Sequence, residues 1–414
     1  MPDPEKVIHP RLRPVEAFPV RLDGKEVLCL RDPMGLAEQP IFLNGALVFI
    51  VSLMDGSNSM RDIQAEYLRK MGSIPYMEEL EELVRQLDQY RYLDSPSFRN
   101  YYEDLVRDFR NSSKRPPIHA GGAYEKDAEG LRSQIDSFFE HPEGPGPVGA
   151  VVDGNRLRGL IAPHIDFHRG GPTYGHAYRS LAIHPGADRF IIFGTCHNPM
   201  DRRFALTEKD YDTPLGCAET DRDFVRSLAS KLSVDYFHDE IAHRGEHSIE
   251  FQAVCLKYLY GEERQFKIVP ILVGSFHDIY SDGKTAAEDP EVEAMVKAVR
   301  TTMEEMPSKY CIVAGADLAH VGRRFGDPSG PTQEFLREIE RDDRILLSRV
   351  EAGDAEGVFQ LIAADNDRRR VCGYPPIYMT LRCVQEPRAQ LLQYRQWADL
   401  EAGAAVTYAS LAIF

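Results

Sequence analysis

The chain beyond about residue 150 alternates short apolar runs with segments long enough to form helices. The apolar runs have the sequences LRGLIAPH, RFIIFGTCH, FKIVPILVGS and KYCIVAGADLAH, at residues 157–164, 189–197, 266–275 and 309–320. Ile, Val and Phe occupy successive positions in these runs, so both sides of each strand are expected to be buried. The pattern predicts an α/β domain in which helices cover both faces of a sheet.

The first hundred residues follow a different pattern. Apolar and polar residues alternate through 15–33 on either side of Asp23-Gly24, as in a β-hairpin. Apolar residues then recur at helical spacing in 59–72 and in 77–93. The N-terminal part is therefore expected to be a small unit built from a hairpin and helices.

A charged helical pattern ends in the sequence SSKRPP at 112–117, which is typical of a linker. Since 414 residues exceed the usual size of one domain, we place a boundary near Ser113 and expect domains at 1–112 and 113–414. On composition alone, the Pro/Gly-rich stretch at 141–150 is an alternative boundary.

Composition narrows the classes of function. The chain has 49 Lys and Arg against 65 Asp and Glu, a formal net charge of −16, which opposes binding to nucleic acid or to an anionic membrane. The chain has no apolar stretch of about 20 residues and no apolar signal-peptide core, so we expect a cytoplasmic protein without a membrane span. Seven cysteines without a C-x-x-C pair argue against a disulfide framework or a zinc ribbon.

Three apolar runs end in a histidine: His164, His197 and His320. In open α/β sheets, ligands bind outside the carboxyl ends of the strands, so these three side chains are expected to converge on one site. Neutral imidazole is a common metal ligand, and a catalytic metal typically takes about three protein ligands. The residues leave open whether a third ligand is a carboxylate or a thiolate.

Other polar residues lie close to these positions in the sequence. His247 and Glu250 share a helix face, and either could orient a ligand imidazole or belong to a helix-cap network. Asp317, three residues before His320, either fixes the tautomer of that histidine or caps a turn. Cys372 is expected on a turn because a glycine and two prolines follow it closely.

Six ordered motifs within residues 114–414 resemble those of MEMO-like proteins, a group also named AmmeMemoRadiSam system protein B: APHIDFHRGG, GTCHNP, TPLGCAETD, EHSIEFQ, GADLAHVG and VCGYPPIY. The resemblance supports the boundary near Ser113 and implies the fold of LigB-type class III extradiol dioxygenases, which hold non-haem iron. By this resemblance His164, His197 and Cys372 are metal ligands, the cysteine replacing a glutamate, and His320 is the acid/base. Asp166 and His168 depart from the family motif and are expected to alter the rim of the pocket.

The resemblance implies an iron- or copper-dependent oxidoreductase that acts on an unknown small-molecule substrate, with zinc as a further choice of metal. The alternative is a non-catalytic binding or scaffold protein that works with a radical SAM partner. The segments LMDGSNSMRDI and LVRQLDQYRYLD resemble PqqD-like winged-helix domains, so the N-terminal domain is expected to recognise a peptide or a partner protein. Zinc hydrolysis is disfavoured because H-E-x-x-H and G-x-S-x-G motifs are absent.

Overall fold

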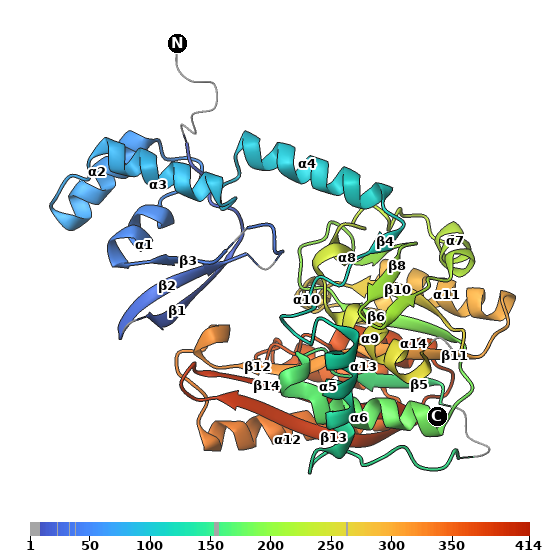
Figure 1. The fold of residues 1–414 in the computed structure, drawn as a ribbon. Helices are drawn as coiled ribbons and strands as arrows, with labels where there is room; N and C mark the ends of the chain where they lie inside the picture. The colour runs from blue at the N-terminus through green and yellow to red at the C-terminus, as the bar shows by residue number, and fades with distance from the viewer. Residues whose placement is uncertain (1–8, 23, 33, 38, 153–156, 262–263) are drawn as a thin grey trace. The chain divides into compact units, whose positions relative to one another are not determined.

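The computed structural model describes residues 9–22, 24–32, 34–37, 39–152, 157–261 and 264–414 (Figure 1). Contacts within the chain divide these residues into two compact units, with the division between Asn111 and Ser112. Each unit has its own hydrophobic core. No described helix combines the length and the apolar character needed to cross a bilayer.

The N-terminal unit contains a three-stranded antiparallel sheet in the order β1-β2-β3, with strands at Glu16–Leu22, Lys25–Arg31 and Ile41–Leu43. Four helices follow: α1 (Gly45–Ser52), α2 (Met60–Met71), α3 (Met77–Gln89) and α4 (Pro96–Asn111). The predicted hairpin and both predicted helices are confirmed, although Asp23 of the hairpin turn lies outside the described residues. Ser59 caps α2 by accepting a hydrogen bond from the Asp62 N–H.

The C-terminal unit is built on an eight-stranded mixed sheet in the order β12-β14-β5-β11-β6-β10-β7, with β13 paired to β14. The four central strands β5, β11, β6 and β10 run parallel, and the outer strands are antiparallel. The bounds are β5 Gly159–Ala162, β6 Arg189–Thr195, β7 Phe204–Leu206, β10 Lys267–Val273, β11 Tyr310–Gly315, β12 Asp317–Val321, β13 Ala389–Asp399 and β14 Ala404–Ile413. Every predicted apolar run therefore supplies one of the central parallel strands.

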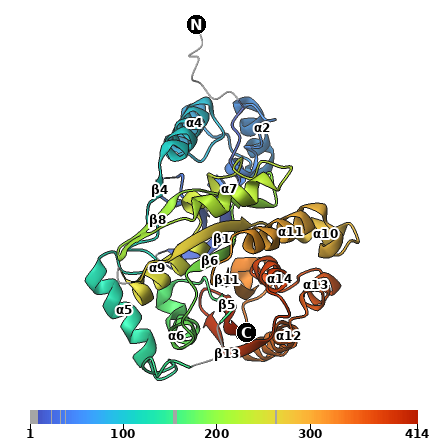
Figure 2. The ribbon, with the colours of Figure 1, turned by 90° about the vertical axis from the view of Figure 1, so that its right-hand side faces the viewer.

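Helices cover both faces of this sheet, as predicted (Figure 2). One face packs on α5 (Ala128–Glu140), α6 (Phe167–Ile183) and α9 (Ser248–Tyr260). The other face packs on α7 (Arg222–Ser230), α11 (Pro290–Glu305), α12 (Gln333–Glu351), α13 (Ala355–Ala364) and α14 (Tyr374–Cys383). A small sheet joins β4 (Lys114–Arg115), β8 (Asp210–Thr213) and β9 (Gly216–Ala218), and two short helices, α8 (Ala242–Gly245) and α10 (His277–Ser281), complete the unit.

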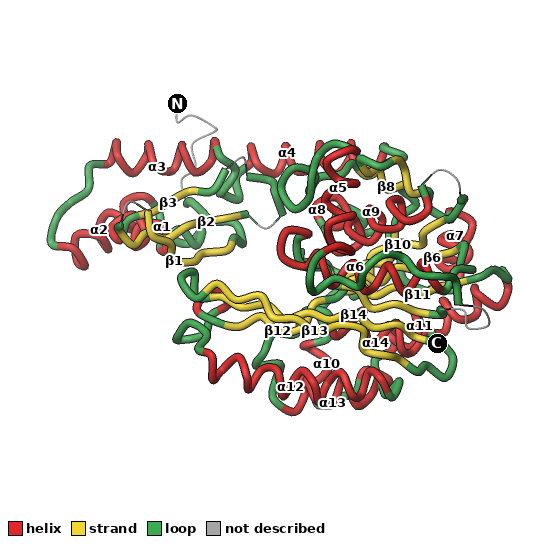
Figure 3. The backbone as a smooth tube through the Cα atoms, turned by 60° about the horizontal axis from the view of Figure 1, so that its bottom comes forward, coloured by secondary structure: helices red, strands yellow, loops and turns green. Residues whose placement is uncertain are grey.

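The apolar run at 309–320 differs from the prediction because it forms two strands. Ala316 alone separates the two strands: β11 lies in the parallel part of the sheet, and β12 pairs antiparallel with β14. Figure 3 shows β12, β13 and β14 side by side. His320 consequently lies inside β12 opposite Val406, and not after the end of a parallel strand. In the sequence only Gly315 and Asp317 interrupt the apolar run at this point, because both strands are buried.

Candidate metal centre

The centre of the site lies at the carboxyl ends of β5 and β6, on either side of β11. His164 follows β5 and His197 follows β6, and their ring centroids lie 5.0 Å apart. His164 is buried, whereas His197 is exposed. The pair therefore extends from the interior of the unit to its surface.

A third histidine joins this pair from the start of α9. Gly315, at the end of β11, lets the helix approach the sheet, because a Cβ atom at this position would lie 2.5 Å from the backbone oxygen of Ser248. The Ser248 hydroxyl donates a hydrogen bond of 2.7 Å to the Thr195 carbonyl at the end of β6. His247 precedes Ser248, and its ring centroid lies 5.3 Å from that of His164 and 5.0 Å from that of His197.

The three rings present one possible ligand nitrogen each, and these nitrogens all lie within 4.8 Å of one another. The Nδ1 atom of each ring faces an acceptor: the Gly315 carbonyl at 3.0 Å from His164, and the Glu246 carboxylate at 3.1 Å from both His197 and His247. These acceptors favour the tautomer with hydrogen on Nδ1, which leaves the lone pair of Nε2 for a metal.

Cys372 lies in the turn before α14, as predicted, with its Sγ atom 3.3 Å from His164 Nε2. The turn is close to β12, because a Cβ atom on Gly373 would lie 2.3 Å from the Asp317 carbonyl oxygen. Desolvation raises the pKa of the Cys372 thiol, but His164 and His320 together hold this pKa well below its usual value. Desolvation lowers the pKa of His164, and the charges of Asp317 and Cys372 outweigh it and raise the pKa to about 9.

The thiolate of Cys372 and the protonated imidazole of His164 thus favour each other. A metal would replace the proton of that imidazole. One thiol and three imidazoles match the donor preference of iron, copper and zinc rather than that of calcium or magnesium. The residues present therefore fit a transition metal.

Comparison with known proteins supports the resemblance. The family model described as Memo-like protein matches residues 115–412. The chain belongs to this family. Its relatives include MEMO1 family proteins of Aquifex aeolicus (28% identical over 388 residues, 93% of this chain and 95% of the relative), Methanopyrus kandleri (31% over 292 residues, 69% and 93%) and Thermus thermophilus (26% over 349 residues, 84% and 96%).

The Memo-like region coincides with the C-terminal unit, whose mixed sheet and covering helices are consistent with a Memo/LigB-like α/β fold. The match to the Aquifex aeolicus relative is longer than this unit, so the similarity also reaches into the N-terminal unit.

Asp317 and His320 complete the inner part of the Memo-like site. Asp317 Oδ1 accepts a hydrogen bond of 2.8 Å from the His164 N–H, and Oδ2 lies 3.8 Å from His164 Nε2. The Nδ1 atom of His320 lies 3.2 Å from the Leu318 carbonyl, which is the acceptor that orients this ring. Asp317 therefore anchors the turn at His164, the second of the two roles that the sequence left open. Desolvation lowers the pKa of His320, but the Cys372 thiolate outweighs it and raises this pKa.

The carboxylate that contacts the imidazoles is Glu246 rather than Glu250. Glu250 is buried, and it binds Arg115, the Tyr124 hydroxyl and the His119 N–H. The helical spacing of His247 and Glu250 singled out the wrong carboxylate, because Glu246 and His247 lie in the turn before α9, where helical spacing does not apply. The adjacency of Glu246 and His247 in the motif EHSIEFQ was the signal in the sequence.

The contacts of Asp166 and His168 are with residues other than the three histidines. Asp166 caps α6 by accepting a hydrogen bond of 3.1 Å from the Arg169 N–H, and it also pairs with the Arg169 guanidinium at 3.0 Å. His168 is exposed on α6, 3.3 Å from the Gln134 side chain, and lines a separate cavity of about 360 Å³. Of the two residues that depart from the family motif, His168 therefore lines a neighbouring cavity and Asp166 caps α6.

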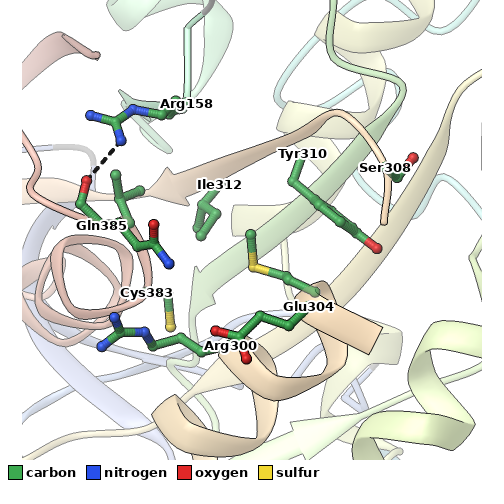
Figure 4. Close-up of a pocket in the computed structure, with 10 residues that line it drawn as sticks. Arg158, Arg300, Glu304, Ser308, Tyr310, Ile312, Cys383 and Gln385 are labelled. Carbon is green, nitrogen blue, oxygen red and sulfur yellow. Dashed lines mark hydrogen bonds between the residues drawn. The ribbon is translucent and has the colours of Figure 1, made fainter. Parts of the chain in front are cut away.

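A further cavity, of about 240 Å³, lies at the amino ends of β5 and β11 (Figure 4). Arg158 and Tyr310 line it at these strand ends, and Arg158 donates a hydrogen bond of 2.8 Å to the Gln385 carbonyl. His164 and His197 follow the carboxyl ends of β5 and β6, whereas this cavity lies at the amino ends of the strands. The cavity is therefore distinct from the candidate metal centre.

The segment that carries Glu246 is fastened by a buried ion pair. Arg115 donates to the His243 carbonyl at 2.9 Å and to the Glu246 carbonyl at 2.8 Å, and it also pairs with Glu250, both side chains being fully buried. Replacing Arg115 by Met leaves the Glu250 carboxylate without its cation. We expect the free energy of unfolding to fall by about 3–5 kcal/mol, as measured by denaturant titration of the full chain.

The exposed pair Arg226–Glu208, joined at 2.7 Å, supplies the matched control. Arg226→Met is expected to change the free energy of unfolding by less than about 1 kcal/mol, since exposed pairs contribute little. Equal effects of the two substitutions would contradict the role given to Arg115.

Proposed function

We propose that this Memo-like protein binds a redox-active transition metal, iron or copper, through His164, His197 and Cys372, and acts as an oxidoreductase on a small molecule. The observation that carries the proposal is the Sγ–Nε2 distance of 3.3 Å between Cys372 and His164, in a group of imidazoles whose Nδ1 atoms face acceptors. A bound ion of this kind would supply electron transfer or activation of a small molecule at an open position.

The chain's own residues would orient and protonate the reactant. Exposed His197 marks the side from which a small molecule enters. In the proposed function His320, whose pKa is raised by the Cys372 thiolate, holds a proton beside the ligand group, and Asp317 fixes the backbone of His164. A neutral reactant that gains negative charge during the reaction would receive this proton.

Metal analysis of the full chain purified without oxygen tests the proposal, together with electron paramagnetic resonance of the bound ion. Stoichiometric iron or copper supports a redox role. Zinc alone would favour a non-redox role, and a chain that neither retains nor takes up any of these metals would point to the alternative, a binding or scaffold protein.

For the N-terminal unit we propose recognition of a peptide or of a radical SAM partner. Among the described strands β1 pairs only with β2, so its other edge is available for an added strand. The proposed metal ligands all belong to the C-terminal unit, which divides the two roles between the units.

Deleting residues 1–111 is therefore expected to leave metal stoichiometry unchanged. The three proposed ligands, and the acceptors at the Nδ1 atoms of the two imidazoles, belong to residues after Ser112. Metal content by mass spectrometry, with circular dichroism as the test of folding, measures the outcome. Loss of metal from a folded truncated chain would contradict the assignment of the site to one unit.

A further inference from the structure

The Glu246 carboxylate occupies an unusual position, because it serves two adjacent histidines at once. It is buried, with 2% of its surface exposed. Oε2 accepts a hydrogen bond of 2.8 Å from the His197 N–H, and Oε1 accepts one of 2.8 Å from the His247 N–H. The same carboxylate also lies 3.1 Å from Nδ1 of each ring, so it fixes both the backbone and the side chain of both residues.

This arrangement aligns the two rings. The imidazoles of His197 and His247 are stacked, with centroids 5.0 Å apart and an angle of 10° between their planes. Since both Nδ1 atoms face Glu246, both Nε2 atoms point away from it, in the same general direction. The ring of His164 stands edge-on to both, at angles of 87° and 84°.

The usual structural role of a histidine at a helix start does not account for His247. It occupies the N-cap position of α9, yet its side chain makes no capping hydrogen bond. Within the described part of the chain its only polar side-chain contact is with Glu246, through Nδ1. Nε2 of His247 is therefore left for a further ligand, and His247 belongs to the three histidines that each have a ring nitrogen within 4.8 Å of those of the other two.

We propose that His247 is a metal ligand through Nε2, together with His164 and His197, and that Glu246 is the positioning residue for both His197 and His247. The inference rests on the proposed metal-binding function and adds a third imidazole to the ligand set. The site then offers three nitrogen donors besides the Cys372 thiolate. Three imidazoles suffice to hold a borderline ion such as Co²⁺ or Zn²⁺ without the sulfur.

Titration of the metal-free full chain with Co²⁺ against a competing chelator tests the inference, because cobalt absorption reports both affinity and ligand type. Glu246→Gln is expected to weaken Co²⁺ binding by about 10- to 100-fold, the usual effect of losing a residue that hydrogen-bonds to a metal ligand. His247→Gln removes a ligand itself and is expected to weaken Co²⁺ binding more than Glu246→Gln does. Cys372→Ser is expected to keep Co²⁺ bound but to lose the absorption of the cobalt–sulfur bond.

His119 supplies the matched control. Its ring centroid lies 5.5 Å from that of His247, but its Nε2 is engaged with the Gly245 carbonyl at 3.0 Å. His119→Gln is expected to leave Co²⁺ affinity unchanged. X-ray absorption of the cobalt-loaded wild-type chain gives an answer that needs no variant, since it counts imidazole ligands directly, and we expect three.

The inference and the proposed function fail in different ways. If His247→Gln binds Co²⁺ like the wild type while His164→Ala does not, or if wild-type cobalt carries two imidazoles, the inference is overturned and the proposed function stands. If His164→Ala also binds like the wild type, both are overturned.

Discussion

Replacing His164 by alanine is expected to remove the metal from the protein while the fold survives. His164 contacts both the thiol and the other two imidazoles of the site. Its Nε2 lies 3.3 Å from the Cys372 sulfur, and its ring contacts those of His197 and His247. Removal of a residue that hydrogen-bonds to a metal ligand lowers metal affinity about 10- to 100-fold. Removal of the ligand His164 itself should lower metal affinity by more than this. Metal content and Co²⁺ affinity measure the effect, with circular dichroism as the test of folding.

His168→Ala is the appropriate control. It removes an imidazole from the same motif, but His168 is exposed on α6 and contacts Gln134 rather than the ligand group. Its metal content should equal that of the wild type. If both variants keep the metal, the ion is bound elsewhere and the assignment of the centre is wrong.

His320→Ala is expected to give the opposite result, with metal retained and turnover impaired. His320 approaches the centre from β12, and it does not belong to the group of three imidazoles whose nitrogens lie within 4.8 Å. A general acid or base contributes about 100- to 10,000-fold to a rate. We expect a loss of that order in the turnover of the metal-loaded protein, at unchanged metal stoichiometry.

Metal loss from a folded His320→Ala variant would identify His320 as a ligand. The role of Cys372 would then have to be reassigned, because His320 and His164 both contribute to the low pKa of this thiol. Phe325→Leu serves as the control for packing, since the Phe325 ring lies against that of His320 with centroids 5.1 Å apart.

The central strands and two of the site histidines could be predicted from the sequence for a physical reason. Strands buried on both faces leave continuous apolar runs, and parallel strands end at the same edge, so His164 and His197 had to approach each other. The position of His320 could not be predicted in this way, because β12 follows β11 after Ala316 alone, and Gly315 and Asp317 do not reveal that the second strand pairs with β14.

Glu246 was missed, and His247 was predicted only as a residue that supports a ligand, because their positions depend on packing across the sheet. The helix that follows them approaches β11 closely only because residue 315 is a glycine, and this contact is invisible in the spacing of residues along the chain. Periodicity relates residues within one element, and here it related His247 to Glu250, whose carboxylate binds Arg115 instead.

The separation of the donors along the chain links the site to folding. Cys372 and His164 lie 208 positions apart, and they meet only where β12, β5 and the turn before α14 have already assembled. In the unfolded chain, holding these donors together would require closing a very long loop, so an ion would bind the folded chain far more strongly than the unfolded one. At a free metal concentration 100 times the Kd, such preferential binding would add about 2.7 kcal/mol to the free energy of unfolding. Under the proposed function, withdrawal of the metal would therefore lower the stability of the C-terminal unit.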